Sequence, residues 1–145
     1  MNLVIERFYS EQKPIQAVTA NGDIVQAERS LNAVEKAFQP LEKSPYADKV
    51  VVVVDRQNNA GALQNFKNHH KALCASGRFI ELPVGSLEEY YPAAWARTAI
   101  QVATMDGHKK GQLAKKAGRE IDQAAFEAGM PVIYSALTRA WQEAF

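Results

Sequence analysis

The sequence predicts an α/β fold, with a small, mostly parallel sheet of residues 1–84 followed by a helical portion of residues 85–145. Residues 50–54 are five consecutive valines, a β-branched run that is apolar at every position. Such a run is typical of a central parallel strand that is buried on both faces. Segments with helical spacing precede and follow it, in the order expected of strand–helix–strand crossovers. The length of 145 residues and the apolar fraction of 47% fit a single domain.

Two strands are expected ahead of the valine run. Residues 3–8 predict the first strand, with Glu6 near its end, and residues 15–20 predict the second. An Asn-Gly pair follows the second strand and supplies the positive φ angles of a tight turn. Apolar residues at spacings of three and four within residues 27–41 then predict a helix.

A helix and a further strand are expected after the valine run. Residues 63–73 carry apolar side chains and His70 on one helix face, and Ser76-Gly77 ends this helix. Residues 79–82 predict a strand that Pro83 stops. The order is β-β-α-β-α-β, so the last two strands should run parallel and end at the same edge of the sheet.

The C-terminal half is expected to be helical. Residues 93–102 predict one helix, ended by Gly107, and residues 109–121 a second, basic helix. The usual explanation of its charges is a solvated face, and a face that contacts phosphates is the sharper alternative. A last helix follows Pro131, and we expect it to pack on the sheet. Its apolar stripe consists of Val132, Ile133, Ala136, Leu137, Ala140 and Trp141.

Composition narrows the functional classes. The formal net charge of +1 provides neither a basic nor an acidic global field. The single cysteine excludes an internal disulfide, and no apolar run is long enough for a membrane span, so we expect a cytoplasmic protein without membrane contact. The sequence lacks the glycine-rich and nucleophile motifs of ATPases, dinucleotide enzymes and serine hydrolases.

Asp55 directly follows the valine run, at the edge where open α/β sheets bind ligands. It is interpreted as a metal-ligating carboxylate or, alternatively, as a loop aspartate that caps a turn or the next helix. Gln57 stands where a second carboxylate would complete Asp-x-Asp, and its neutral carbonyl oxygen is a poorer ligand for Mg²⁺. Arg56 adds a positive charge that would compete with a cation unless its side chain points away.

Glu88 is the second candidate carboxylate. Ser86 and Glu89 have the spacing of a capping box, which is a sufficient structural role for Glu89. Glu88 is left without such a role and follows the strand next to Asp55, which would place the two residues to share a metal ion.

Taken together, these segments resemble the Toprim nuclease domain of the OLD (overcoming lysogenisation defect) family. The resemblance rests on the apolar strand ending in Asp55, on Leu-Pro-Val-Gly-Ser-Leu-Glu-Glu-Tyr-Tyr-Pro at residues 82–92, and on Lys-Gly-Gln-Leu-Ala at residues 110–114. It extends over roughly residues 15–121. Its motifs are short and moderately specific.

The resemblance implies a parallel sheet, Mg²⁺ or Mn²⁺, cleavage of DNA phosphodiesters and a separate ABC-type ATPase as partner. Asp55 and Gln57 would take the place of the family's Asp-x-Asp, and Ser86 and Glu88 that of its later acidic site. Lys110 would take the place of a basic residue that neutralises phosphate. Glu6 would take the place of the glutamate that ends the family's first strand. Gln57 is a departure, and the segment after Glu6 is too short for the family's next helix, which indicates a truncated or degenerate domain.

A non-catalytic interaction or oligomerisation domain is the alternative from a different functional class. Its apolar last helix would pair with a partner or with a second copy of the chain. Gln57 and the missing helix favour this alternative, whereas Asp55 and Glu88 favour the enzyme. The sequence leaves open whether a nucleic-acid partner is DNA or RNA.

Overall fold

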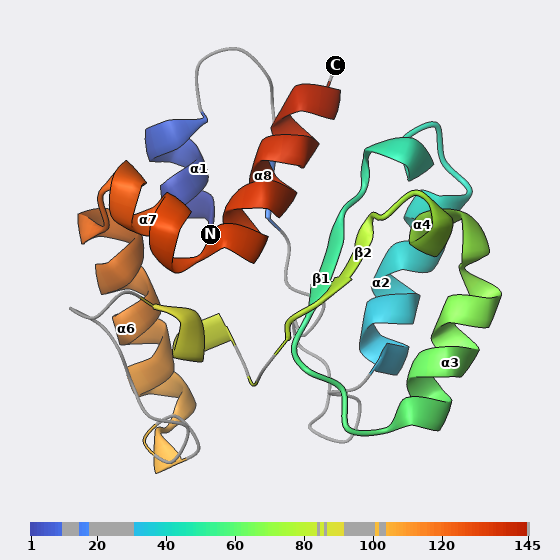
Figure 1. Cartoon of the computed structure of the whole chain (residues 1–145), viewed down its shortest axis with the longest axis horizontal. Helices are drawn as coiled ribbons and strands as arrows, with labels where there is room; N and C mark the ends of the chain where they lie inside the picture. The colour runs from blue at the N-terminus through green and yellow to red at the C-terminus, as the bar shows by residue number, and fades with distance from the viewer. Residues whose placement is uncertain are drawn as a thin grey trace.

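The computed structural model describes residues 1–9, 15–17, 31–83, 85, 87–91, 101 and 104–144. These residues form two lobes, each with its own cluster of buried apolar side chains. Figure 1 shows the α/β lobe on the right and the helical lobe on the left, with α8 between the two. The coarse prediction of α/β character with a helical C-terminal portion is confirmed.

The sheet consists of β1 (Val52–Val54) and β2 (Phe79–Glu81), which pair in parallel as predicted. Val54 pairs with Glu81 in the register, so both strands end at one edge. The expected burial of the valine run on both faces is wrong, because Val54 is 7% exposed but Val53 is 37% exposed. One face of the sheet is therefore packed closely, and the other is partly open.

Helices pack on the closed face of this sheet: α2 (Leu31–Glu42), α3 (Ala60–His69) and α4 (Lys71–Ala75). A 3-10 turn, η2 (Ala47–Lys49), leads into β1. α3 begins after Asn59, whose side-chain oxygen accepts a hydrogen bond from the amide of Ala62 at 3.0 Å. The buried cluster of this lobe consists of Leu31, Phe38, Val54, Phe66 and Leu73.

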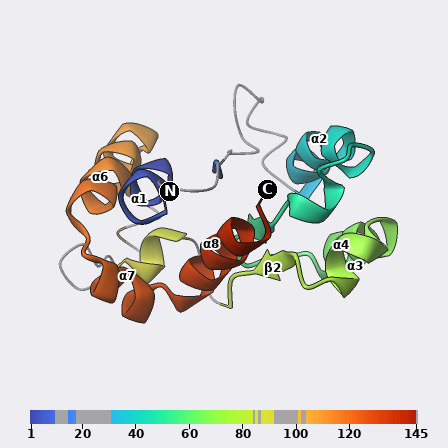
Figure 2. The same cartoon turned by 90° about the horizontal axis from the view of Figure 1, so that it is seen from above.

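The helical lobe contains α1 (Asn2–Phe8), η3 (Leu87–Tyr90), α6 (Gly107–Glu120), α7 (Gln123–Gly129) and α8 (Pro131–Glu143). Its helices share one apolar core, and Figure 2 shows them grouped beside the sheet. The buried members of this core are Val4, Ile5, Tyr9, Leu82, Tyr91, Leu113, Ala117, Ile121, Phe126, Met130 and Ile133.

The predicted first strand at residues 3–8 is wrong, because these residues form α1. The apolar residues Met1, Val4, Ile5 and Phe8 are spaced as on one helix face, and this face packs in the helical core. Residues 15–17 of the second expected strand are not in a strand, and residues 18–20 lie outside the described part of the chain. Within the described residues the sheet is therefore smaller than predicted, with two strands.

Two helix boundaries in the C-terminal half follow from capping side chains. Gly107 begins α6 instead of ending a helix, because Oδ1 of Asp106 accepts a hydrogen bond from the amide of Lys109 at 2.8 Å. Asp122 caps α7 in the same way, with a bond of 2.7 Å from the amide of Ala125. Pro131 begins α8, as predicted. Most of the helix predicted at 93–102 lies outside the described residues.

The apolar stripe of α8 packs mainly in the helical core, and not on the sheet as expected. The hydroxyl groups of Tyr9 and Thr138 are 3.0 Å apart and hydrogen bonded. The rings of Tyr9 and Trp141 have centroids 6.3 Å apart. α8 therefore packs beside Tyr9, the residue that follows α1, and within the core of the helical lobe.

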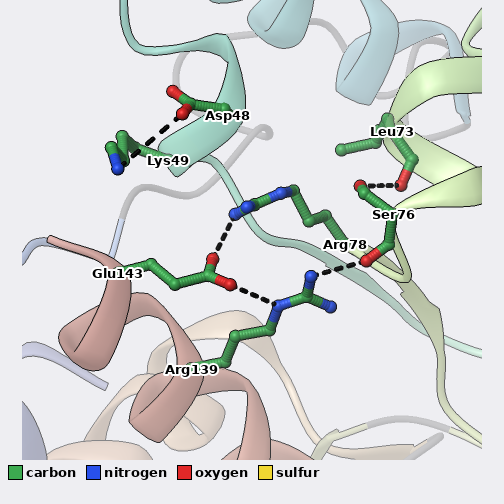
Figure 3. Close-up of polar contacts among 7 residues, drawn as sticks. All are labelled: Asp48, Lys49, Leu73, Ser76, Arg78, Arg139 and Glu143. Carbon is green, nitrogen blue, oxygen red and sulfur yellow. Dashed lines mark hydrogen bonds and ion pairs between the residues drawn. The ribbon is translucent and has the colours of Figure 1, made fainter.

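Polar side chains connect α8 to the start of β2 (Figure 3). Glu143 binds two arginines, Arg78 beside β2 and Arg139 one turn earlier on α8, where Nε of Arg139 lies 3.2 Å from Oε1. Arg139 also donates a hydrogen bond of 2.5 Å to the carbonyl oxygen of Ser76. This network, the Arg78–Glu143–Arg139 latch, joins the two lobes.

Candidate site at the carboxyl ends of the strands

Backbone hydrogen bonds continue the parallel pairing beyond the strands. The amide of Leu82 donates to the carbonyl oxygen of Val54 at 2.9 Å, and the amide of Arg56 donates to that of Gly85 at 3.0 Å. The loop that carries Asp55 therefore runs beside the segment that leads into η3. This confirms, for the backbone, that the two candidate segments leave the sheet at one edge.

Asp55 lies in this loop with an exposed side chain. The side-chain Nε2 of Gln57 donates a hydrogen bond of 2.7 Å to the backbone carbonyl oxygen of Asp55. This bond folds Gln57 back onto the loop and gives its side chain a role in the turn. The side chain of Gln57 thus helps to hold the backbone on which Asp55 is mounted.

Arg56 points toward β2. Its guanidinium group donates a hydrogen bond of 3.0 Å to the carbonyl oxygen of Pro83, and Nε lies 3.7 Å from Oε1 of Glu81. The positive charge that would compete with a cation near Asp55 is thus held against an acidic side chain of the neighbouring strand.

Glu81 is a residue of this edge that the sequence reasoning did not select. Its side chain is 22% exposed, and its Oε2 is buried without a hydrogen-bond partner in the described part of the chain. A carboxylate at the last position of an otherwise apolar strand was the available signal, because buried charges are normally paired. Glu81 supplies the counter-charge of Arg56.

The remaining predicted site residues lie in the helical lobe. Glu88 is on η3, and its side chain is outside the described set. Lys110 is half-buried on α6, three residues before Leu113, on the side of the helix that faces the core shared with η3. Glu6 is exposed on α1, where it lines an open pocket with Asn2, and Figure 1 shows α1 away from the end of β1. Glu6 is therefore on a helix and not, as the sequence predicted, at the end of a strand.

Within the described ranges, no three histidine, cysteine, aspartate or glutamate side chains are grouped so that they could hold a metal ion. Among the described residues of this edge, Asp55 carries an exposed carboxylate, and Oε1 of Glu81 lies 3.7 Å from Nε of Arg56. A cation bound here would therefore take further oxygen ligands from Glu88, from water or from a phosphate group.

A second polar cluster lies inside the α/β lobe, where the sequence predicted only a helix face. His70 is 3% exposed, and its Nδ1 and Nε2 lie 3.0 Å from Glu42 and 2.9 Å from Glu35 of α2. Burial lowers the pKa of His70, but the hydrogen bonds to Glu42 and Glu35 outweigh it and raise the pKa above its usual value. Both ring nitrogens face carboxylate oxygens, which accept hydrogen bonds, so this cluster favours the doubly protonated ring and joins α2 to the junction of α3 and α4.

Comparisons with known proteins identify no relative. No protein-family model matches the sequence, and no curated protein or solved structure shows significant similarity to it. None of the helices in the described part of the chain is both long and apolar enough to span a membrane.

Proposed function

We propose that this chain is a Toprim-like module that binds a divalent cation together with a nucleic-acid phosphate at the carboxyl ends of β1 and β2, and that it promotes phosphodiester hydrolysis. The hydrogen bond between the amide of Arg56 and the carbonyl oxygen of Gly85 is the observation that carries this proposal. It supports a shared edge for the Asp55 loop and the segment leading to Glu88.

The chemistry of the side chains fits a cation that is completed by its substrate. Mg²⁺ is commonly bound through one or two carboxylates plus substrate phosphates, and it keeps several waters. Asp55 and Glu88 would supply the carboxylates, and Gln57 is tied to the carbonyl oxygen of Asp55. Such a set supports weak binding of the free ion and stronger binding in the presence of nucleic acid.

Each residue of the proposed site has a distinct role. The chemistry that Mg²⁺ or Mn²⁺ supplies at such a site is activation of water and stabilisation of charge that develops on phosphate. Asp55 and Glu88 would hold the cation through their carboxylates, and Lys110 would neutralise phosphate charge. Glu81 of β2 holds the side chain of Arg56 against that strand, which keeps the guanidinium charge from displacing the cation.

Cleavage and metal-binding assays with matched variants test the proposal. Asp55→Asn and Glu88→Gln should abolish Mn²⁺-dependent cleavage of DNA. Asp48→Asn is the control, because Asp48 is an exposed carboxylate of the same lobe that pairs only with Lys49 among the described side chains. Wild-type protein without metal-dependent cleavage, or an Asp55→Asn variant that cleaves like the control, would overturn the proposal.

The alternative of an interaction domain receives less support from the fold. It depended on an apolar last helix available for a partner. In the described part of the chain, Ile133 and Ala136 of this helix are buried, and Tyr134, Leu137 and Trp141 pack against the helical core.

A further inference from the structure

Positive charge in this protein is concentrated on α6. The residues of this helix include five lysine or arginine side chains and one glutamate, a formal charge of +4, whereas the whole chain carries +1. The rest of the chain is therefore net acidic, with a formal charge of −3. The excess of positive charge on α6 is therefore a property of this helix and not of the whole protein.

Three of these cations lie on the outer surface of α6. Leu113 and Ala117 are buried against the core, and Cβ at Gly118 would lie 3.1 Å from Cβ of Leu3 on α1. The helical spacing of 3.6 residues per turn directs the opposite side to solvent. The exposed cations on that side, called the basic stripe below, are Lys115, Lys116 and Arg119.

Among the described side chains, no carboxylate pairs with the basic stripe. Within the described part of the chain, none of its three cations lies within 4.0 Å of a carboxylate, whereas Lys109 is 3.7 Å from Asp106 on the preceding turn. At the start of this surface, His108 and Gln112 are hydrogen bonded at 2.9 Å. The stripe thus presents unpaired charge to solvent along one line.

We infer that the basic stripe binds the phosphate backbone of double-stranded DNA. Duplex DNA carries one negative charge per about 1.7 Å of its axis, and exposed lysine and arginine side chains that contact it release condensed counterions. A helix of 14 residues is about 21 Å long, which is enough to contact several phosphates. The inference rests on the proposed function in naming nucleic acid as the polyanion.

The side chains of α6 favour a duplex over a single strand. Proteins that bind single strands combine a basic groove with aromatic side chains on which the bases stack. α6 contains no phenylalanine, tyrosine or tryptophan. Its rigid line of cations can contact phosphates but offers no surface for unpaired bases, so the expected binding is independent of sequence.

The basic stripe is separate from the proposed cleavage site. Lys110 lies on the side of α6 that faces the core, whereas the stripe faces solvent. Substitutions in the stripe should therefore change DNA affinity without removing a group that acts at the phosphodiester. Because the stripe needs no metal ion, DNA binding can be measured in EDTA, which removes the cation and prevents cleavage.

Fluorescence anisotropy with a labelled DNA duplex, measured in EDTA over a series of NaCl concentrations, tests the inference. The triple variant Lys115→Ala, Lys116→Ala, Arg119→Ala should bind more weakly at low salt, and its plot of log K against log[salt] should be less steep by about 2–3. The matched control is Lys43→Ala, Lys67→Ala, Lys71→Ala, which removes three exposed lysines from the α/β lobe. It should retain the wild-type slope.

A conservative variant guards against a folding defect. Lys115→Arg, Lys116→Arg, Arg119→Lys keeps the charges and should bind like the wild type. The inference is overturned if the wild type does not bind duplex at low salt, if the alanine variant keeps the wild-type slope, or if a single strand binds more tightly than the duplex. Salt-dependent duplex binding without metal-dependent cleavage would refute the proposed function and leave this inference intact.

Discussion

The backbone amide of Arg56 donates a hydrogen bond to the carbonyl oxygen of Gly85, with a nitrogen–oxygen distance of 3.0 Å. This bond lies beyond the last register pair of the sheet, Val54 and Glu81, and it holds together the two loops that leave β1 and β2. Two segments that are about thirty residues apart thus meet at one edge, as the parallel arrangement of strands requires.

Gln57 should limit the affinity of this edge for metal. The wild type is expected to bind free Mg²⁺ in the millimolar range, which corresponds to about −4 kcal/mol or weaker. Gln57→Asp adds a carboxylate and should strengthen binding, as measured by titration calorimetry. Micromolar binding by the wild type, or no gain from Gln57→Asp, would contradict this role.

His70 should make stability depend on pH on the alkaline side. Its pKa is raised in the folded protein, so its stabilising contribution is complete below the unfolded pKa of about 6.5 and is lost as pH rises through the folded value. His70→Gln should lower the free energy of unfolding by about 1.5–3 kcal/mol near neutral pH. Urea unfolding at a series of pH values from below about 6.5 upward should show this loss of unfolding free energy at alkaline pH in the wild type only. Parallel pH profiles in the two proteins would argue against a protonated His70.

Glu143 should contribute on the acidic side. Burial raises its pKa, but the hydrogen bonds and charges of Arg139 and Arg78 lower it more, so the net pKa is below the usual value. Its contribution is present above the unfolded pKa of about 4.3 and is lost as pH falls through the folded value. Glu143→Gln should cost about 0.5–1 kcal/mol at neutral pH, because the carboxylate is 32% exposed. The melting temperatures of the wild type and Glu143→Gln should differ at neutral pH and converge at acidic pH. An equal difference in melting temperature at both pH values would exclude the Arg78–Glu143–Arg139 latch as its cause.

Trp141 should stabilise the monomer through the helical core. It is partly buried and lies beside Tyr9, so Trp141→Ala should cost about 3 kcal/mol and leave the hydrodynamic size unchanged. Thermal unfolding and analytical sizing measure the two effects. An unchanged melting temperature with a smaller hydrodynamic size would instead favour the interaction domain.

The parts of the fold predicted from sequence are those with one consistent local pattern. The valine run and residues 79–82 have patterns that favour a strand over a helix, and both contain strands. The inward face of α6 was predicted from the spacing of Leu113, Ala117 and Ile121, which are all buried. The strand prediction at residues 3–8 is wrong because a short apolar segment fits both a strand and a helix, and tertiary packing on α6 decides between them.

The polar clusters were harder to predict than the strands, because their members come from different elements. Glu35 and Glu42 are seven residues apart, on one face of α2, but only the packing of α2 against α3 brings His70 between them. The pairing of Arg56 with Glu81 likewise depends on the register of β1 with β2, which the sequence does not specify.

We expect the Asp55 loop and the segment carrying Glu88 to form one cation site. Nuclear magnetic resonance with Mn²⁺ as a paramagnetic probe tests this expectation, because Mn²⁺ broadens the amide signals of residues close to it. Low concentrations of Mn²⁺ should broaden the signals of residues 55–57 and of residues 87–89 together, and Asp55→Asn should abolish both effects while Asp48→Asn leaves them unchanged. Broadening of only one segment, or of exposed carboxylates throughout the protein to the same extent, would contradict a shared site.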